Sequence, residues 1–402
     1  MGLRKKLSAQ YHVSRLDRQA AQHGVLVVGA PRSGPVAVVV GGQVGDAGAD
    51  AGPAGAIGTY RARDGSAGVA VGIDIDGPHV GVVVGKRGYG KSYTLGVLAE
   101  ELARVPALAP VVIDPMGVFA PLAELAGTAV RVRRRPRVSA DTIPPAGWCA
   151  LLGVDPASPA GSVLWQAVDT ASTIAAMRWA ITRIDAAPAA CRAADNYLGL
   201  AASWDVFDPD GLDAAALTEG ALTVLDCSHL PDSAINAVGH AVADALYGAR
   251  VRGEISRLPW ILIDEAHALF DGAAEPALTR IVTRGRQPGV SLVAATQRPA
   301  ALPPVVTSQA DLLVAHRLTA TPDRDRLEAI APTYMGGSFG ARMPEAPGEV
   351  LVVDDVTERV PRVAIRERHT PHGGESPRAT AVKPPADSRP PSHTCSDGSQ
   401  DT

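Results

Sequence analysis

Residues 85–92, GKRGYGKS, place glycines, a lysine and a serine at a spacing that can bind phosphate. The pattern is GxxxxGK[ST], in which glycines let successive backbone N–H groups point at phosphate oxygens and a following helix adds a favourable dipole. We expect Lys91 to neutralise phosphate charge and the Ser92 hydroxyl to bind Mg²⁺. The alternative is a glycine-rich turn that binds nothing. The predicted nucleotide contacts are Gly85, Lys86, Arg87, Gly88, Tyr89, Gly90, Lys91, Ser92 and Tyr93.

Two acidic residues end the apolar run PWILIDE at 259–265. A carboxylate at the carboxyl end of a sheet strand lies beside a phosphate loop, so Asp264 is the second predicted ligand of Mg²⁺. Glu265 is placed to orient or deprotonate an attacking water, which favours hydrolysis over transfer to another acceptor. The alternative is a helix that begins at these residues, where acids merely suit the dipole.

Polar residues near residue 290 suggest further chemistry. Gln297 follows the apolar run SLVAAT, and a glutamine there can sense the terminal phosphate or position water. Arg284 and Arg286 lie in the loop before that run, where an arginine supplied to a neighbouring subunit can stabilise transition-state charge. A polar strand end and a solvated basic loop are the corresponding alternatives.

Elements of two kinds must position these residues. Continuous Val/Ile/Leu runs bounded by turns are typical of strands in a parallel sheet covered on both faces. Such runs alternate with helical patterns, which predicts an α/β fold. They are GVVVG, PVVID, ALTVLDC, PWILIDE, SLVAATQ, DLLVAHR and GEVLVVDD.

The chain divides into regions of different composition. Residues 1–75 carry short β-rich runs such as GVLVV, VAVVVGG and AGVAVGIDI, which predict a small barrel-like region. We expect the main core over 76–368, with an alanine-rich helical insert at about 121–220. Residues 369–402 are rich in Pro, Ser, Asp and Gly, which predicts a disordered tail.

The overall charge and the cysteines restrict partners and location. A net charge of −4 gives no global basic signature, so any nucleic-acid contact must use a local patch. Four scattered cysteines without a CxxC pair are typical of a reducing cytosol. No apolar run reaches membrane-spanning length and the start lacks a signal-peptide pattern, so we predict a cytoplasmic protein.

The run RVRRRPR, residues 131–137, is the candidate local patch, with five arginines in seven residues. They could contact DNA phosphates. The favoured alternative is an edge strand with one arginine face in solvent, which Pro136 supports.

Taken in order, GKRGYGKSYTLGVLAEEL, VVIDPMGVF, LTVLDCSHLP, ILIDEAHALF and TRGRQPGVSLVAATQRPAALP resemble the HerA/FtsK superfamily of hexameric translocating ATPases, and its HerA branch most. The resemblance implies a RecA-like P-loop NTPase core of the ASCE type and a homohexamer that moves on double-stranded DNA. It assigns Lys91, Asp264, Glu265 and Gln297 to the roles given above. It also implies that Asp114 is a second active-site acid and that a trans-acting arginine lies in TRGRQ, with Arg284 favoured over Arg286.

Four functions follow as hypotheses. The first is an ATP-hydrolysing DNA translocase or helicase that works with a partner nuclease in DNA end processing. The second keeps the motor but packages or transfers viral or plasmid DNA. A nucleotide-dependent scaffold without translocation is the third, and a small-molecule kinase the fourth. Glu265 disfavours the last two, because neither needs a carboxylate that activates water.

Overall fold

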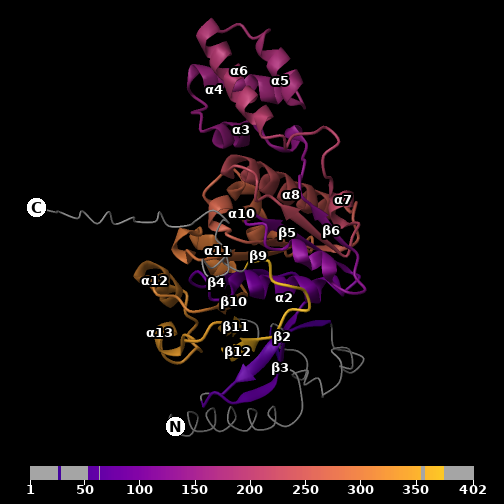
Figure 1. The fold of residues 1–402 in the computed structure, drawn as a ribbon. Helices are drawn as coiled ribbons and strands as arrows, with labels where there is room; N and C mark the ends of the chain where they lie inside the picture. Colours follow the sequence, from indigo (N-terminus) through magenta and orange to yellow (C-terminus); the bar gives the residue numbers. More distant parts are fainter. Residues whose placement is uncertain (1–25, 29–52, 63, 355–357, 375–402) are drawn as a thin grey trace, which may run out of the picture.

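The protein is built on a 12-stranded sheet in the order β1-β3-β2-β12-β11-β10-β4-β9-β8-β5-β7-β6 (Figure 1). The computed structural model describes residues 26–28, 53–62, 64–354 and 358–374 of the 402. From β10 to β6 every described pairing is parallel, whereas β11, β12 and β2 pair antiparallel with their neighbours. The strands are β1 Leu26–Val28, β2 Ala54–Arg61, β3 Ala67–Asp74, β4 Val80–Val84, β5 Leu108–Asp114, β6 Val130–Arg133, β7 Leu222–Asp226, β8 Leu258–Ile263, β9 Ser291–Thr296, β10 Leu312–Ala315, β11 Glu349–Asp354 and β12 Arg362–Ile365.

Helices cover both faces of the parallel part. Alternate residues of one strand face opposite ways, so Val82 and Val84 join one core while Val83 joins the other. The helices in the described residues are α2 Lys91–Ala103, α3 Pro145–Leu152, α4 Pro159–Thr170, α5 Ile174–Ile181, α6 Pro188–Ser203, α7 Ala214–Thr218, α8 Asp232–Arg252, α9 His267–Phe270, α10 Glu275–Arg284, α11 Pro304–Gln309, α12 Thr321–Ala329 and α13 Phe339–Arg342, with short 3₁₀ turns at Ala120–Glu124, Ala140–Thr142 and Pro299–Ala301. Helix α2 packs on one face, and α8 and α10 pack on the other.

Helices α3 to α6 form a separate lobe with a core of its own (Figure 1). Trp148, Leu164, Met177 and Leu198 are buried in it. Two chain segments connect the lobe to the sheet, and Val138 and Phe207 form a parallel bridge between them. The predicted helical insert at about 121–220 includes this lobe, but it also includes β6, which pairs with β7 at the end of the main sheet.

The fold is the α/β fold that the sequence predicts, with a mainly parallel sheet. Each of the seven apolar runs contains a strand of that sheet: β4, β5, β7, β8, β9, β10 and β11. The sheet places β9 between β4 and β8, so the phosphate-loop strand and the strand that ends in acids are separated by one strand. This is the strand arrangement expected of an ASCE core.

The N-terminal strands differ from the expected barrel. GVLVV contains β1 and AGVAVGIDI contains β3, whereas VAVVVGG lies outside the described residues. Strand β2 was not predicted, because glycines and alanines weaken its apolar pattern. Within the described residues these strands extend the main sheet through the β2–β12 pairing instead of closing on themselves.

The predicted tail begins inside the described part of the chain. Residues 369–374 are described and make hydrogen bonds with α2, whereas residues 375–402 lie outside the described residues. Among the described helices, none combines the length and the apolar character that a membrane span requires.

Candidate nucleotide-binding site

The loop between β4 and α2 has the geometry of a phosphate cradle. Gly88 and Gly90 take φ values of 79° and 104°, in the left-handed region that favours glycine. Gly90 is the N-cap of α2 and has no side chain to cap it, so the first N–H groups of the helix are directed to the loop. Arg87 and Gly88 are exposed, and Lys86 lies with its Nζ 4.4 Å from the centre of the Tyr89 ring. The helix begins at Lys91, where its dipole favours an anion.

His316 lies directly beneath this loop and was not predicted from the sequence. It is fully buried, and its Nε2 is 3.0 Å from the Thr94 hydroxyl. Burial, and secondarily the charge of Lys91, lowers the pKa of His316 to about 3, so the ring is neutral. A Cβ at Gly85 would come within 2.5 Å of the His316 Cβ, so this position requires glycine. The only sequence signal was a histidine at the end of the apolar run DLLVAHR.

Ser92 and Asp264 come together from segments 172 residues apart. The Ser92 hydroxyl donates a hydrogen bond of 2.6 Å to Oδ2 of Asp264. The Asp264 carboxylate is 1% exposed, and burial raises its pKa while the bond from Ser92 opposes that rise. Two hard oxygen ligands beside a phosphate loop are what Mg²⁺ prefers. The donor set therefore fits the metal that the sequence predicts here.

Lys91 and Glu265 complete the charge balance of the site. Lys91 is 6% exposed, and burial lowers its pKa while Glu265 and Asp264 raise it. Burial also raises the pKa of Glu265, with a further contribution from Asp264. The pKa shifts of Lys91, Asp264 and Glu265 have two causes in common, burial and the charge of a neighbour, as expected when charged groups lie together with little water around them.

Asp114 is at the end of β5, the strand next to β8, but its oxygens are used locally. They accept backbone N–H groups of Met116, Gly117 and Phe119 at 3.1, 2.8 and 2.8 Å. Burial raises the pKa of Asp114 to about 6, even though these donors favour the ionised form. This geometry is that of a residue that holds a turn, and the catalytic role of Asp114 stays a prediction.

Gln297 follows β9, so it emerges between the phosphate loop and Asp264 at the same edge of the sheet. It is half-buried. The preceding Thr296 is fully buried and pairs in register with Val84, the last residue of β4. The register brings the predicted sensor residue to the carboxyl edge where the phosphate loop begins.

Arg284 and Arg286 are placed at the opposite edge. Both are exposed, and they come before β9, whereas the phosphate loop follows the end of the parallel strand β4. Gly289 of the same loop lies against Leu258, the first residue of β8. A six-residue strand spans roughly 16 Å or more. The two arginines are therefore remote from the phosphate loop of their own chain.

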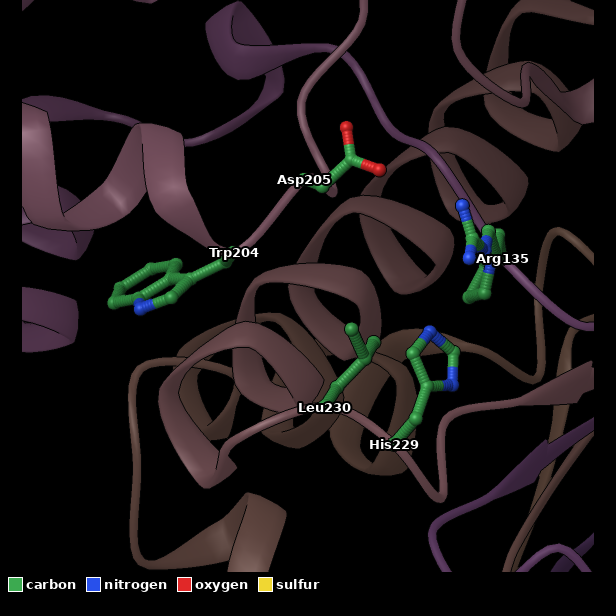
Figure 2. A pocket seen from close by; sticks show the side chains of 6 residues that line it. Arg135, Trp204, Asp205, His229 and Leu230 are labelled. Atoms are coloured by element: carbon green, nitrogen blue, oxygen red, sulfur yellow. The ribbon is translucent and has the colours of Figure 1, made fainter.

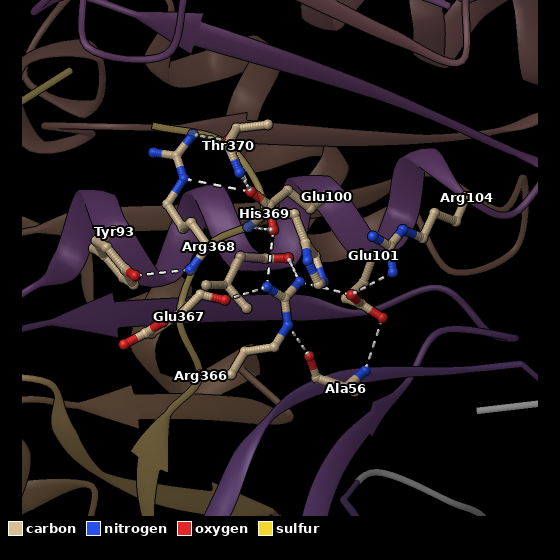
Figure 3. A network of polar contacts seen from close by, with 11 residues as sticks. Ala56, Tyr93, Glu100, Glu101, Arg104, Arg366, Glu367, Arg368, His369 and Thr370 are labelled. Atoms are coloured by element: carbon tan, nitrogen blue, oxygen red, sulfur yellow. Dashed lines mark hydrogen bonds and ion pairs between the residues drawn. The ribbon is translucent and has the colours of Figure 1, made fainter. Parts of the chain in front are cut away.

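A C-terminal strap, residues 366–372, crosses α2 (Figure 3). Its His372 packs against Tyr93 in the first turn of that helix. Glu100 of α2 is fully buried and accepts bonds from Arg366 Nη1 at 2.9 Å and from the backbone N–H groups of His369 and Thr370 at 3.1 and 3.0 Å. Arg366 also donates to Glu101 at 2.6 Å. Sequence reasoning missed this network, because its partners are more than 260 residues apart.

The strap also contacts the first turn of α2. The backbone N–H of Arg368 donates to the Tyr93 hydroxyl at 2.7 Å, and the His372 ring packs edge-on against the Tyr93 ring at 5.3 Å. Tyr93 was predicted as a nucleotide contact. Its hydroxyl oxygen accepts a bond from the strap, and its contact with a nucleotide stays a prediction.

The arginine run at 131–137 is partly neutralised by ion pairs. Arg131 pairs with Glu219 at 2.6 Å, and Arg137 pairs with Asp205 at 2.9 Å. Strand β6 is the last strand at its end of the described sheet, which confirms the edge-strand interpretation. Arg134 and Arg135 are exposed. Arg135 lines a cavity of about 210 Å³ with His229 and Trp204 between the lobe and the sheet (Figure 2).

Comparison with known proteins gives one family and one fold. Residues 56–187 match the family DUF87, described as the central domain of helicase HerA. No curated protein matches the chain. The solved structure of VirB4 of Thermoanaerobacter pseudethanolicus is similar with a TM-score of 0.61 at 15% identity, over 77% of this chain and 96% of that one. At this identity the likeness shows the fold alone.

The genome packaging NTPase B204 from Sulfolobus turreted icosahedral virus 2, in complex with ATP-gammaS, matches at 12% identity over 71% of this chain and 96% of that one. Its TM-score of 0.39 is too low to support an argument. The family match includes the phosphate loop, and the fold shared with VirB4 extends over most of this chain. Residues 56–187 thus resemble the central domain of helicase HerA, and the chain shares its fold with VirB4.

Proposed function

We propose that this protein is a Mg²⁺-dependent ATPase that works as a ring and moves on double-stranded DNA. The observation that carries the proposal is the 2.6 Å bond between Ser92 and Asp264 beside the buried Lys91. It joins the phosphate loop to a strand-end acid, which is the arrangement that phosphoryl chemistry on a nucleotide requires. The family match over residues 56–187 supports the motor function, since that family is described as a helicase domain.

Each residue of the site has a distinct task in this proposal. The loop N–H groups and Lys91 bind and orient the phosphates. Ser92 and Asp264 hold Mg²⁺, which when bound neutralises charge on the phosphate oxygens. Glu265 orients the attacking water and takes a proton from it, and its raised pKa suits a general base. Gln297 lies at the same edge and contacts the terminal phosphate or the water.

The position of the arginines supports the proposed ring. Because Arg284 and Arg286 are remote from the phosphate loop of their own chain, neither serves that site directly. A neighbouring copy in a ring, which we propose to be a hexamer, can receive one of them at its own site. An arginine supplied in this way stabilises charge that develops during transfer.

The DNA contact we propose is the exposed pair Arg134 and Arg135. Their neighbours Arg131 and Arg137 are already paired with carboxylates, so they have less charge to offer. Arg134→Ala/Arg135→Ala should raise the DNA concentration needed for half-maximal stimulation and weaken the salt dependence of binding. Arg252→Ala removes another exposed arginine charge, one that pairs with Glu254, and serves as the control.

A packaging or transfer motor of the same superfamily is the second candidate. The observation that supports this second candidate is the fold shared with VirB4, which extends over 96% of that chain. The chemistry at the site is the same in both, and the two differ only in partners. A partner nuclease would indicate DNA end processing, whereas viral or plasmid DNA-processing proteins would indicate packaging or transfer.

The test is the ATPase rate of the full chain with Mg²⁺, with and without linear duplex DNA. We expect turnover that duplex DNA stimulates and that Lys91→Ala abolishes together with tight ATP binding. Equal rates for Lys91→Ala and the parent would refute the assigned site. An ATPase rate that duplex DNA does not change would be consistent with an ATPase but would refute the proposed movement on DNA.

A further inference from the structure

Glu265 has a strained backbone and an unsatisfied side chain. Its φ is 48°, a left-handed value that a non-glycine residue adopts at a cost of about 1 kcal/mol or more. One carboxylate oxygen, Oε2, is buried and accepts no hydrogen bond. A strained residue persists only where its surroundings enforce it, and strained residues cluster at functional sites. A buried polar atom without a partner also calls for an explanation, such as a catalytic role.

The ring of His267 lies close to that oxygen. Its Nδ1 lies 3.4 Å from Glu265 Oε2 and 3.2 Å from the Thr296 hydroxyl oxygen. That hydroxyl oxygen also accepts the backbone N–H of Arg298 at 3.0 Å. The single nitrogen Nδ1 is therefore placed between the glutamate and the end of β9.

Nδ1 can serve only one of these two partners well. Burial, followed by the charge of Arg298, lowers the pKa of His267, so the ring is neutral and carries one N–H. A bare Nδ1 can accept the Thr296 hydroxyl but cannot donate to Glu265, and in the structure Glu265 Oε2 has no hydrogen-bond partner. When Nδ1 carries the hydrogen, it can donate to Glu265 instead.

The backbone ties the same two segments together. The N–H of Ala266 donates to the carbonyl of Ala295 at 2.9 Å, so the residue after Glu265 is bonded to β9. Gln297 lies between Thr296 and Arg298, the two residues that meet at the Thr296 hydroxyl. A shift of Gln297 toward a phosphate would therefore disturb the Thr296 contact of His267 first.

We propose that His267 is a positioning residue that exchanges its Nδ1 contact between Thr296 and Glu265, and so couples the turn after β9 to the orientation of the glutamate. The inference rests on the proposed function, in which Glu265 acts on water. With Thr296 as partner the glutamate oxygen is unsupported. With Glu265 as partner the carboxylate is fixed for its task, and the turn that carries Gln297 selects between the two.

The test compares His267→Leu, His267→Asn and Thr296→Val in the full chain. His267→Leu removes the shared contact and should lower kcat by about 10²-fold, the effect of a misplaced catalytic group. Its Kd for a fluorescent ATP analogue and its Tm should stay near those of the parent. His267→Asn keeps a polar group near the position of Nδ1 and should recover most of the lost kcat.

A double-mutant cycle separates coupling from simple damage. If His267 and Thr296 act through one contact, His267→Leu/Thr296→Val should be no slower than His267→Leu alone. Additive losses, or a loss of ATP affinity and Tm that parallels the loss of kcat in all variants, would overturn the inference. So would near-normal kcat in His267→Leu. An inactive parent chain would overturn the proposed function and this inference with it, whereas an active parent that is indifferent to His267 overturns this inference alone.

Discussion

At the residue scale, Lys91, Asp264 and Glu265 share a space with little water. Burial lowers the pKa of the lysine and raises the pKa of both acids, so each charged form is costly there. A Mg²⁺–nucleotide complex would bring both signs of charge to this space and pair them. The site is thus arranged so that its own charges are better compensated when it is loaded.

Glu265 is the group whose loss should separate binding from turnover. Glu265→Gln keeps the shape of the side chain but cannot accept a proton, so we expect kcat to fall by about 10²- to 10⁴-fold with ATP still bound. Equilibrium binding of a fluorescent ATP analogue and steady-state phosphate release measure the two effects. Hydrolysis close to that of the parent would move the general base elsewhere.

Asp114 should respond differently, because its oxygens hold a turn. Asp114→Asn replaces one acceptor oxygen by a donor, so at least one of the N–H groups of Met116, Gly117 and Phe119 loses its partner. We expect a loss of about 1–3 kcal/mol in the free energy of unfolding, measured with urea at pH 7. A collapse of kcat with unchanged stability would instead support the predicted catalytic role.

At the element scale, the C-terminal strap fixes the helix that begins at the phosphate loop. Burial alone would raise the pKa of Glu100, but hydrogen bonds from His369, Thr370 and Arg366 outweigh it and hold the pKa below its ordinary value. A depressed carboxylate pKa contributes stability above the unfolded-state value near 4.5, and that contribution is lost as the pH falls through the lower folded value. The strap therefore stabilises α2 at neutral pH.

Breaking this network should cost more than breaking a surface pair. Arg366→Ala leaves Glu100 and Glu101 buried without their main counter-charge, and we expect a loss of about 3–5 kcal/mol in the free energy of unfolding at pH 7. The deficit should shrink as the pH falls through the folded-state pKa of Glu100, because protonation removes its charge. Arg178→Ala, which breaks the exposed pair with Asp195, should cost 1 kcal/mol or less. Equal losses in the two variants would contradict the role of the strap.

The strap also gives a prediction for truncation. A chain that ends at Gly374 keeps every strap contact described here, and its Tm and ATPase rate should match those of the full chain. A chain that ends at Ile365 lacks the strap and should lose both. If the chain that ends at Gly374 failed to assemble, that result would show that residues beyond 374 contact a neighbouring subunit.

The sequence predicts a strand best where the strand is a continuous apolar run that can be recognised without its partners. The runs ending at Asp114 and Asp264 are continuously apolar and buried, so each is recognisable alone. Strand β6, which alternates Val and Arg, is favoured as an edge strand from the sequence, whereas β2 is not predicted. The strap, His316 and the contact of His267 with Thr296 depend on partners distant in the chain, for which a single sequence holds no signal.

At the scale of the whole molecule, the parallel sheet separates the candidate nucleotide site from Arg284 and Arg286. The phosphate loop, Asp264 and Gln297 meet at its carboxyl edge, whereas Arg284 and Arg286 lie at the other. One chain thus has a nucleotide site and, remote from it, arginines that can serve another site. Such a molecule suits head-to-tail contacts, which close into a ring when the rotation between copies permits it.

Mixed rings test this arrangement. Arg284→Ala and Lys91→Ala should each be nearly inactive alone, with Arg284→Ala losing kcat far more than ATP affinity. Mixed together they should recover part of the activity, because a Lys91-intact site can receive the arginine of a Lys91-defective neighbour. Arg286→Ala measured in parallel decides which arginine is used. No recovery in oligomers shown by native mass spectrometry to be mixed, or full activity in a monomer, would refute the ring.

The central claim, that ATP hydrolysis at this site drives movement on duplex DNA, is tested most directly by displacement of a third strand from a linear duplex. The full chain should displace that strand with ATP and Mg²⁺, and should fail to do so with Glu265→Gln or with a non-hydrolysable analogue. Vigorous ATP hydrolysis by the parent chain on the same DNA, with the third strand left in place, would contradict the account.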